Sequence, residues 1–305
     1  MRVQKILHPT DFSPASRAAL PAALFLAELY DAELLIEHML VFRSADLAHP
    51  EAHFPAPEEL FEKLQALAAS QLGELLHGAT DRPLRLRERV VRAPDETRGI
   101  LDRAEEEEVD LIVLGTHGRT GAMHLLMGSV AAEVLRRARC PVLTVPSAAR
   151  AHPFRKLARI LAADDFSAPA RRALDHAAAL AREVGAELDI AHVLESPEMP
   201  VPPGPVPIGW GSTFYEELEP SVRAGLAEDR RARAPECPGR DHVLRGRGAL
   251  ALIEAAENED VDLIVQATQG RTGLDRLLLG SFAERVARLA HCPVLTVPAG
   301  GKLLV

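Results

Sequence analysis

The sequence predicts an α/β protein built from two tandem domains, each formed around a five-stranded parallel sheet. Short stretches of the first half recur in the same order in the second half, and each half alternates short apolar runs with longer amphipathic stretches. This alternation is typical of βαβ units, whose parallel strands are buried on both faces. The length of 305 residues agrees with two domains, because one domain accounts for roughly 150 residues.

The internal repeat extends through both halves. Four stretches recur at one constant offset: 109–113 as 261–265, 118–121 as 270–273, 128–129 as 280–281, and 140–146 as 292–298. Nearer the start of each half, Asp11 to Ser13 matches Asp165 to Ser167. Ordered matches over such distances indicate a duplication. We expect one domain over residues 1–147 and the other over 153–305, with a small, polar linker between them.

In the first half, apolar runs and helical periodicity divide the chain into nine elements. The expected strands cover 5–8, 33–39, 86–91, 110–114 and 142–145, and the expected helices cover 14–30, 58–76, 95–107 and 129–138. Ser13 and Pro14 are suited to the start of the first helix, and Pro21 should kink it. Right-handed crossovers then bring the loops after the first and fourth strands to the carboxyl edge of the sheet, where ligands bind.

Composition and charge exclude several classes of protein. Apolar residues make up 47% and charged residues 26% of the chain, as in globular proteins with a buried core. The net charge of -9, without a basic block, argues against a nucleic-acid partner. No apolar run is long enough for a membrane span or a signal peptide, and three cysteines without metal-like spacing indicate a reducing compartment. We therefore expect a cytoplasmic protein.

Two insertions interrupt this economical pattern. Residues 43–57 and the Pro/Gly-rich residues 196–211 each follow the second strand of their half. We expect solvated loops there, with a lid over a ligand as the alternative.

A glycine-rich loop follows the fourth strand of the first half. Gly115 and Gly118 are followed by nine residues and then by Gly128 and Ser129, which open a helix. Glycine lets backbone N–H groups approach phosphate oxygens, and the amides of a helix start attract anions. Arg119 adds positive charge. The loop therefore predicts an anion cradle, while a plain helix cap at Gly128 and Ser129 remains the alternative.

Other phosphate-binding motifs do not fit the sequence. The chain has no Walker-type loop. Residues 246–248 with Ala251 match a dinucleotide fingerprint, but they follow the third strand of their half and lack the acidic residue that would take a ribose. We interpret them as a tight turn.

The spaced glycines resemble those of the ATP-binding branch of the universal stress protein family, as do Pro9, Thr10 and Asp11 after the first strand and the terminal strand 141–145. The resemblance covers both halves and implies sheets of the adenine nucleotide α hydrolase type, with strand order 3-2-1-4-5. It also implies that Thr10 and Asp11, next to Pro9, face the ribose and adenine, and that backbone around Met39 holds the adenine edge. The residues implied to surround the phosphates are Gly115, Thr116, His117, Gly118, Arg119, Gly128, Ser129 and Val130. For Asp11, a helix-capping role is the alternative.

The second half departs from this pattern. Ala267 replaces Gly115, Gln269 replaces His117, and Asp164 adds a negative charge beside the expected site. We therefore expect a weaker second site, whose residues would be Asp165, Val193, Gly270, Arg271, Gly280 and Ser281.

The resemblance implies a regulatory stress-response module that binds ATP, or AMP or ADP, with Mg²⁺, and reports its occupancy to an unknown protein partner. We assign no catalytic and no metal-ligating residue. Slow ATP hydrolysis by His8, Asp11 or His117 is the enzymatic alternative, although a histidine near a strand end is more often structural. A nucleotide-independent interaction module is the third reading. The last strands, 142–145 and 294–297, are expected to pair, which predicts an internal pseudo-dimer or a homodimer.

Overall fold

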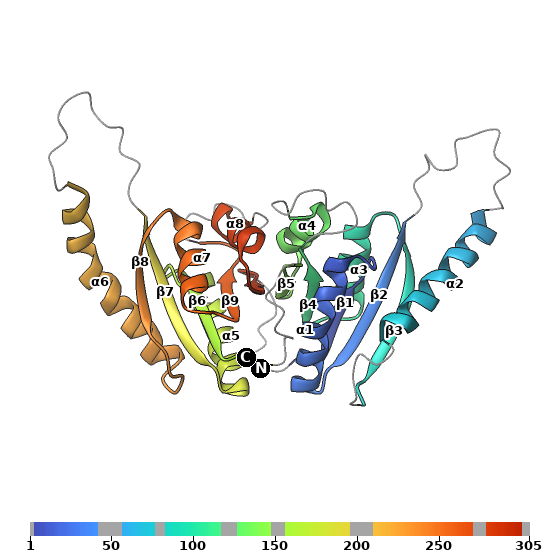
Figure 1. Cartoon of the computed structure of the whole chain (residues 1–305), viewed down its shortest axis with the longest axis horizontal. Coiled ribbons are helices and arrows are strands. Elements are labelled where there is room, and N and C mark those ends of the chain that lie inside the picture. Colours follow the sequence, from blue (N-terminus) through green and yellow to red (C-terminus); the bar gives the residue numbers. More distant parts are fainter. Residues whose placement is uncertain are drawn as a thin grey trace, which may run out of the picture. The chain divides into compact units, whose positions relative to one another are not determined.

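The computed structural model describes residues 3–41, 57–76, 83–116, 127–147, 156–195, 210–270 and 279–300. The chain divides into two compact units, a first unit over Arg2–Arg155 and a second unit over Lys156–Leu303 (Figure 1). Both expected loop insertions, apart from their last residues, lie outside the described ranges.

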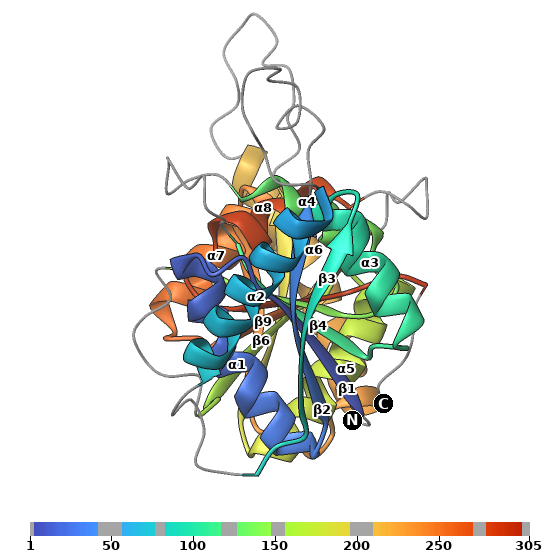
Figure 2. The ribbon, with the colours of Figure 1, turned by 90° about the vertical axis from the view of Figure 1, so that its right-hand side faces the viewer.

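The first unit alternates strands and helices throughout. Its elements are β1 (Lys5–Pro9), α1 (Pro14–Tyr30), β2 (Glu33–Val41), α2 (Pro57–Leu76), β3 (Leu86–Ala93), α3 (Glu96–Glu106), β4 (Leu111–Gly115), α4 (Ser129–Arg137) and β5 (Val142–Val145). The strands lie in the order β3-β2-β1-β4-β5 and pair in parallel, which confirms the predicted order 3-2-1-4-5. Strand β3 is at an edge of this sheet, with α2 beside it (Figure 2).

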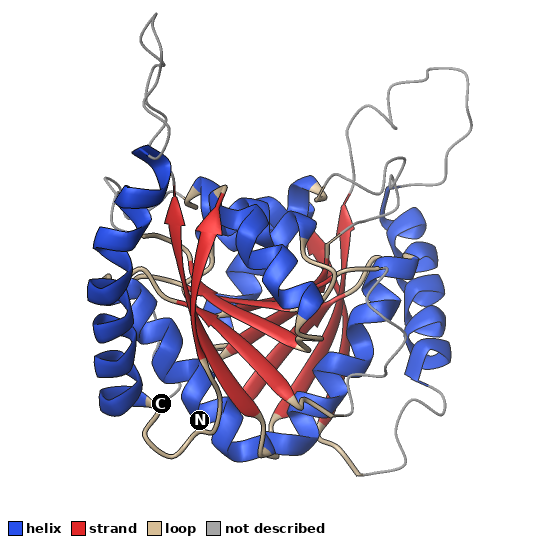
Figure 3. Cartoon of the chain, turned by 60° about the vertical axis from the view of Figure 1, so that its left-hand side comes forward, coloured by secondary structure: helices blue, strands red, loops and turns tan. Residues whose placement is uncertain are grey.

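The second unit repeats this architecture. Its elements are β6 (Arg159–Ala163), α5 (Ala168–Val184), β7 (Glu187–Glu195), α6 (Trp210–Arg233), β8 (Asp241–Gly246), α7 (Gly248–Asn258), β9 (Leu263–Ala267), α8 (Ser281–Leu289) and β10 (Val294–Val297). The order β8-β7-β6-β9-β10, again parallel, is the counterpart of that in the first unit. In both units helices flank the strands (Figure 3).

Local signals set the helix that follows the first strand of each unit. The Ser13 hydroxyl accepts the Ser16 N–H at 3.2 Å at the start of α1. Ser167 caps α5 in the same way. Helix α1 continues from Pro14 to Tyr30 without interruption, so the kink predicted at Pro21 does not divide it.

The repeated Val-Asp-Leu-Ile-Val motif has a structural reason. The Asp110 carboxylate, just before β4, accepts the N–H groups of Gln4 and Lys5 at 2.7 and 3.0 Å. Asp262 holds the start of β6 in the same way. Each aspartate therefore ties the amino end of the first strand to that of the fourth strand and fixes their register.

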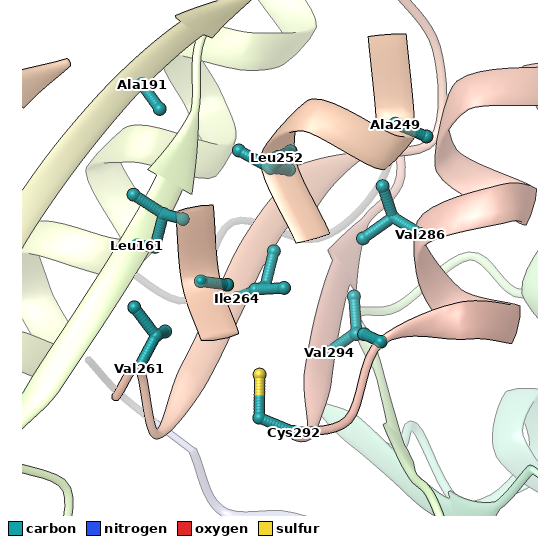
Figure 4. Close-up of a cluster of buried hydrophobic side chains, with 11 residues drawn as sticks. Leu161, Ala191, Ala249, Leu252, Val261, Ile264, Val286, Cys292 and Val294 are labelled. Atoms are coloured by element: carbon teal, nitrogen blue, oxygen red, sulfur yellow. The ribbon is translucent and has the colours of Figure 1, made fainter. Parts of the chain in front are cut away.

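The core lies between the sheet and its helices. In the second unit, Leu161, Ile264 and Val294 of three neighbouring strands pack against Leu252 of α7 and Val286 of α8 (Figure 4). All five side chains are buried. With the strands fixed from both faces, the loops at their carboxyl ends rest on a rigid base.

The first unit also contains a buried ionic network. Glu37 of β2 is fully buried and accepts two hydrogen bonds from the Arg103 guanidinium, at 2.9 and 3.0 Å. Hydrogen bonding to Glu37 raises the pKa of Arg103 despite burial. Burial opposes the charge of Glu107, but hydrogen bonds from Arg103, Arg87 and Lys5 outweigh it and lower the pKa of Glu107 to about 2. The network joins β2 to α3.

Candidate functional site

The turn from β1 into α1 is held by side-chain hydrogen bonds. Thr10 is buried, and its hydroxyl accepts the Phe12 N–H at 3.1 Å and lies 3.1 Å from the Ser16 hydroxyl. The Asp11 carboxylate accepts the Ser13 N–H at 3.0 Å. Because Ser13 itself is the N-cap of α1, Asp11 is not the helix cap but shapes the turn before it. Pro9, the last residue of β1, starts this turn at the carboxyl edge.

A histidine that the sequence analysis missed fixes the same turn. His38 of β2 donates from Nδ1 to the Thr10 carbonyl at 2.8 Å. The Phe12 ring, carried on a residue with a φ of 63°, lies 4.7 Å from the His38 ring.

The second unit contains the same arrangement. His192 donates to the Asp164 carbonyl at 2.7 Å, and Phe166, with a φ of 65°, stacks on His192 at 4.7 Å. The signal was present in the sequence, because His38 and His192 are separated by the same number of residues as the matched motifs that begin at Asp11 and Asp165.

The backbone of Met39 in β2 lies beyond the last paired residues of β1 and β2. β1 and β2 pair as far as Pro9 and Glu37, and the Thr10 N–H donates to the Glu37 carbonyl at 2.9 Å. The backbone N–H and C=O groups of alternate residues in a strand point to the same neighbouring strand. Met39, two residues beyond Glu37, therefore directs its N–H and C=O to the same side as Glu37 does, but past the end of β1. Its side chain packs against Gly99 of α3. The edge thus offers one donor and one acceptor close together.

Gly115, at the end of β4, is a glycine because of packing. A Cβ at this position would overlap the backbone carbonyl of Ala15 in α1, closer than any real Cβ contact. Its φ is not positive. The Gly115 position therefore allows the start of α1 to lie directly on β4, which accounts for the glycine without a ligand.

The base of the glycine loop is closed by one backbone bond. Thr116 is buried, and its carbonyl accepts the Gly128 N–H at 2.7 Å. The predicted site residues His117, Gly118 and Arg119 lie outside the residues that the structure describes.

Helix α4 starts without a side-chain cap. Gly128 occupies the N-cap position and makes no capping bond, whereas Ser13 and Asp95 cap α1 and α3. Ser129 is exposed and Val130 half-buried in the first turn. The first amides of a helix lack intrahelical partners, so α4 presents donors and the positive end of its dipole at the carboxyl edge.

His8 lies beneath this edge and is inaccessible. It is fully buried, and its Nδ1 donates to the Val113 carbonyl at 2.9 Å. Burial lowers the pKa of His8 to about 4, so the ring is neutral near pH 7. A fully enclosed neutral imidazole is not placed to activate water for ATP hydrolysis.

The carboxyl edge of the second unit encloses a cavity of about 350 Å³. It includes most of the residues predicted for the second site: Asp165, Val193, Gly270, Gly280 and Ser281. Arg271 lies outside the described residues. As in the first unit, the N-cap glycine of the following helix, Gly280, makes no side-chain bond, and its N–H donates to the Thr268 carbonyl at 2.8 Å.

Carboxylates crowd this cavity. Asp164 stands where the first unit has Thr10, and its carboxylate accepts the Phe166 N–H at 2.7 Å. Burial, together with Asp229 and Asp165 nearby, raises the pKa of Asp164 to about 6. A Cβ on Gly270 would lie 2.5 Å from a carboxylate oxygen of Asp165, so that carboxylate rests against the glycine loop.

The dinucleotide-like residues form a tight turn, as interpreted from the sequence. Gly246 and Gly248 have φ values of 145° and 43°, and α7 begins at Gly248. The Glu195 carboxylate occupies the space where a Gly248 side chain would be. An acidic group in this position opposes a pyrophosphate.

Within the described ranges, no group of three or more His, Cys, Asp or Glu side chains is arranged to hold a metal ion. No helix in the part of the chain that the structure covers combines the length and apolar character needed to cross a bilayer.

Comparison with known proteins agrees with the architecture. The model of the universal stress protein family matches residues 2–146 and again 156–298. A universal stress protein of Mycolicibacterium smegmatis is 29% identical over 305 residues, covering 96% of both chains. One from Methanocaldococcus jannaschii is 37% identical over 142 residues, which is 46% of this chain and 81% of that protein.

Solved structures share the fold. A universal stress protein from Archaeoglobus fulgidus superposes with a TM-score of 0.64 at 20% identity, covering 98% of this chain and 97% of its own. A protein from Pseudomonas aeruginosa described as a universal stress protein gives 0.65 at 18% identity, over 97% and 93%. Since the family model covers nearly the whole chain in two consecutive matches, the chain belongs to the universal stress protein family, as a tandem member.

Proposed function

We propose that the first unit binds an adenine nucleotide, ATP before AMP or ADP, and that the protein acts as a nucleotide-responsive stress regulator. The observation that carries this proposal is the uncapped start of α4, which opens at the same sheet edge as the Thr10–Asp11 turn and the Met39 backbone beyond the end of the β1–β2 pairing. The amides proposed to bind the phosphates and the backbone groups proposed to bind the adenine then lie at the same carboxyl edge of one sheet.

Each part of a nucleotide has a matching group at this edge. The Met39 C=O and N–H suit the amino group and ring nitrogen of adenine. The Asp11 carboxylate suits the ribose hydroxyls. The phosphates would lie at the first turn of α4, at Ser129 and Val130, and along the loop from Thr116 through His117, Gly118 and Arg119.

Magnesium would be held chiefly by phosphate oxygens and water, as Mg²⁺ commonly is in nucleotide complexes. No side chain is assigned to it. For the second unit we propose weaker binding of polyphosphates, at Asp165, Val193, Gly270, Arg271, Gly280 and Ser281.

We propose binding without fast chemistry. Asp11 shapes a turn and His8 is enclosed, so neither is placed as a general base on a water molecule. A single-turnover assay with labelled ATP tests this. A rate constant for phosphate release above a few per minute, in protein free of contaminating ATPases, would favour the slow-ATPase alternative.

The binding site is tested by Gly128→Val, with Gly280→Val as the matched control at the same helix position of the second unit. Gly128 has an extended backbone that any residue adopts, with φ -60° and ψ 146°, so the fold should tolerate valine. A β-branched side chain over the α4 amides should weaken ATP binding to the full chain at least tenfold, roughly 1.4 kcal/mol. Isothermal titration calorimetry that finds unchanged affinity in a folded Gly128→Val protein contradicts the proposal.

A further inference from the structure

The cavity of the second unit differs in charge from the corresponding edge of the first. Asp164 replaces Thr10, and Glu195, the last residue of β7, stands where β2 has Val41. Together with Asp165, three carboxylates line about 350 Å³ of space. Among the described lining residues, none is lysine or arginine.

The chain's own carboxylates occupy the places that would attract phosphate. Asp165 lies against the backbone of Gly270, and Glu195 lies against Gly248 at the start of α7. A polyphosphate entering this cavity would have to displace these groups and would meet their negative charge at short range, where screening by water and salt is weakest.

The backbone arrangement proposed to bind adenine in the first unit recurs in the second unit. The Asp164 N–H donates to the Ala191 carbonyl at 2.9 Å, so Val193, two residues further along β7, directs its N–H and C=O past the end of β6. The His192–Phe166 pair holds the turn as its counterpart does in the first unit.

The remaining walls suit an uncharged ring system with hydroxyl groups. Ala163 and Phe282 contribute apolar surface, and a carboxylate such as that of Asp165 can accept hydrogen bonds from hydroxyl or amino groups. Cavities of this size with apolar walls and a few polar groups bind small molecules.

We infer that the cavity of the second unit binds a purine nucleoside without phosphate, such as adenosine, in clear preference to nucleoside polyphosphates. The first unit would then bind the phosphorylated form and the second the dephosphorylated form. This inference names the preferred ligand of the weaker second site proposed above, and it does not depend on ATP binding to the first unit.

Equilibrium dialysis of the full chain with radiolabelled adenosine, with and without saturating ATP, tests the inference. We expect one adenosine per chain that ATP does not displace, with an affinity that changes less than about twofold between low and high salt because the ligand is uncharged. ATP alone should bind tightly at one equivalent per chain, in the first unit. Absence of bound adenosine, or its complete displacement by ATP, overturns the inference, whereas absence of ATP binding would contradict only the function proposed for the first unit.

Two variants assign the bound adenosine to the cavity. Phe282→Trp, which fills space beside the base, should abolish adenosine binding and leave the ATP equivalent unchanged. The double variant Asp164→Thr with Glu195→Val carries the residues of the first unit and should admit ATP to the second cavity, at least about tenfold more tightly than in the parent chain. If Phe282→Trp remains folded by circular dichroism and still binds adenosine, the cavity is not the site.

Discussion

The raised pKa of Asp164 makes the stability of the second unit depend on pH. Asp164 is 3% exposed and lies near Asp229 and Asp165, and Arg171 is hydrogen-bonded to Asp229 at 3.1 Å. Burial raises the pKa of Asp164 from 3.8 to about 6. The folded state therefore binds the proton of Asp164 more tightly than the unfolded chain does. The contribution of this proton to the free energy of unfolding is complete below pH 3.8 and is lost as the pH rises through about 6.

Replacing Asp164 by asparagine removes this penalty while keeping an oxygen for the Phe166 N–H. At pH 8 the variant should be more stable than the parent, by on the order of 1–3 kcal/mol, and the difference should shrink toward pH 4. Urea unfolding at several pH values measures it. The reciprocal variant Thr10→Asp should introduce the same pH-dependent loss into the first unit; a difference independent of pH would contradict the assignment.

Gly115 makes a second prediction at the scale of one residue. Gly115→Ala places a methyl group against the Ala15 carbonyl and forces α1 away from β4, which should cost about 1–3 kcal/mol. The matched change in the second unit, Ala267→Gly, creates no overlap and should cost at most about 1 kcal/mol through backbone entropy. Chemical denaturation of both variants compares the two costs. Equal losses would show that packing does not require the glycine.

Among the secondary-structure elements, β2 and α3 depend on one buried ion pair. Arg103→Met would leave the Glu37 carboxylate buried without its two hydrogen bonds, at a cost of about 3–5 kcal/mol. The second unit has Ala191 in place of Glu37, so the double variant Glu37→Ala with Arg103→Met imitates an arrangement that the fold already accepts. It should recover much of the lost stability in a double-mutant cycle. If the double variant is as unstable as the single one, the cost comes from lost packing instead.

The sequence predicted the elements well because their signals are local. Apolar runs placed the strands of the first unit within about two residues of their observed ends, and the Ser13-Pro14 pair located the start of α1. The glycine at position 115 was assigned to a ligand loop, although its contact with Ala15 comes from a segment far away in the chain. The repetition of His38 as His192 was visible in the sequence, but neither the His38–Thr10 bond nor the Glu37–Arg103 pair could be predicted, since each depends on the exact position of one side chain against a neighbouring element.

At the scale of the whole molecule, buried His8 of the first unit and buried Asp164 of the second unit should respond oppositely to pH. Burial lowers the pKa of His8 to about 4, below the ordinary value of 6.5. The unfolded chain therefore takes up a proton at His8 at a higher pH than the folded chain does. The contribution of the neutral ring to the free energy of unfolding is complete above pH 6.5 and is lost as the pH falls toward 4, the reverse of the behaviour of Asp164. Acidification from pH 6.5 to 4.5 should accelerate hydrogen exchange in β1 and β4 more in the parent chain than in a His8→Gln variant, which has no titrating ring. Mass spectrometry of peptides from these strands measures the rates, and equal acceleration in both proteins would contradict the prediction.

The expectation of a homodimer or an internal pseudo-dimer stays a prediction from sequence. Light scattering coupled to size-exclusion chromatography decides the homodimer: twice the 33.0 kDa of one chain is the expected mass. A mass of one chain at working concentrations would contradict it.

The closed base of the glycine loop has a consequence for the history of such a repeat. In both units a main-chain hydrogen bond between described residues joins the ends of the loop: the Gly128 N–H donates to the Thr116 carbonyl, and the Gly280 N–H donates to the Thr268 carbonyl. Main-chain groups are the same in every residue, so the tether does not constrain which amino acids fill the intervening segment. After duplication, the part of that segment outside the repeated residues 118–121 and 270–273 can vary in one copy while the strand and helix on either side keep their positions, and one scaffold can thereby acquire two specificities.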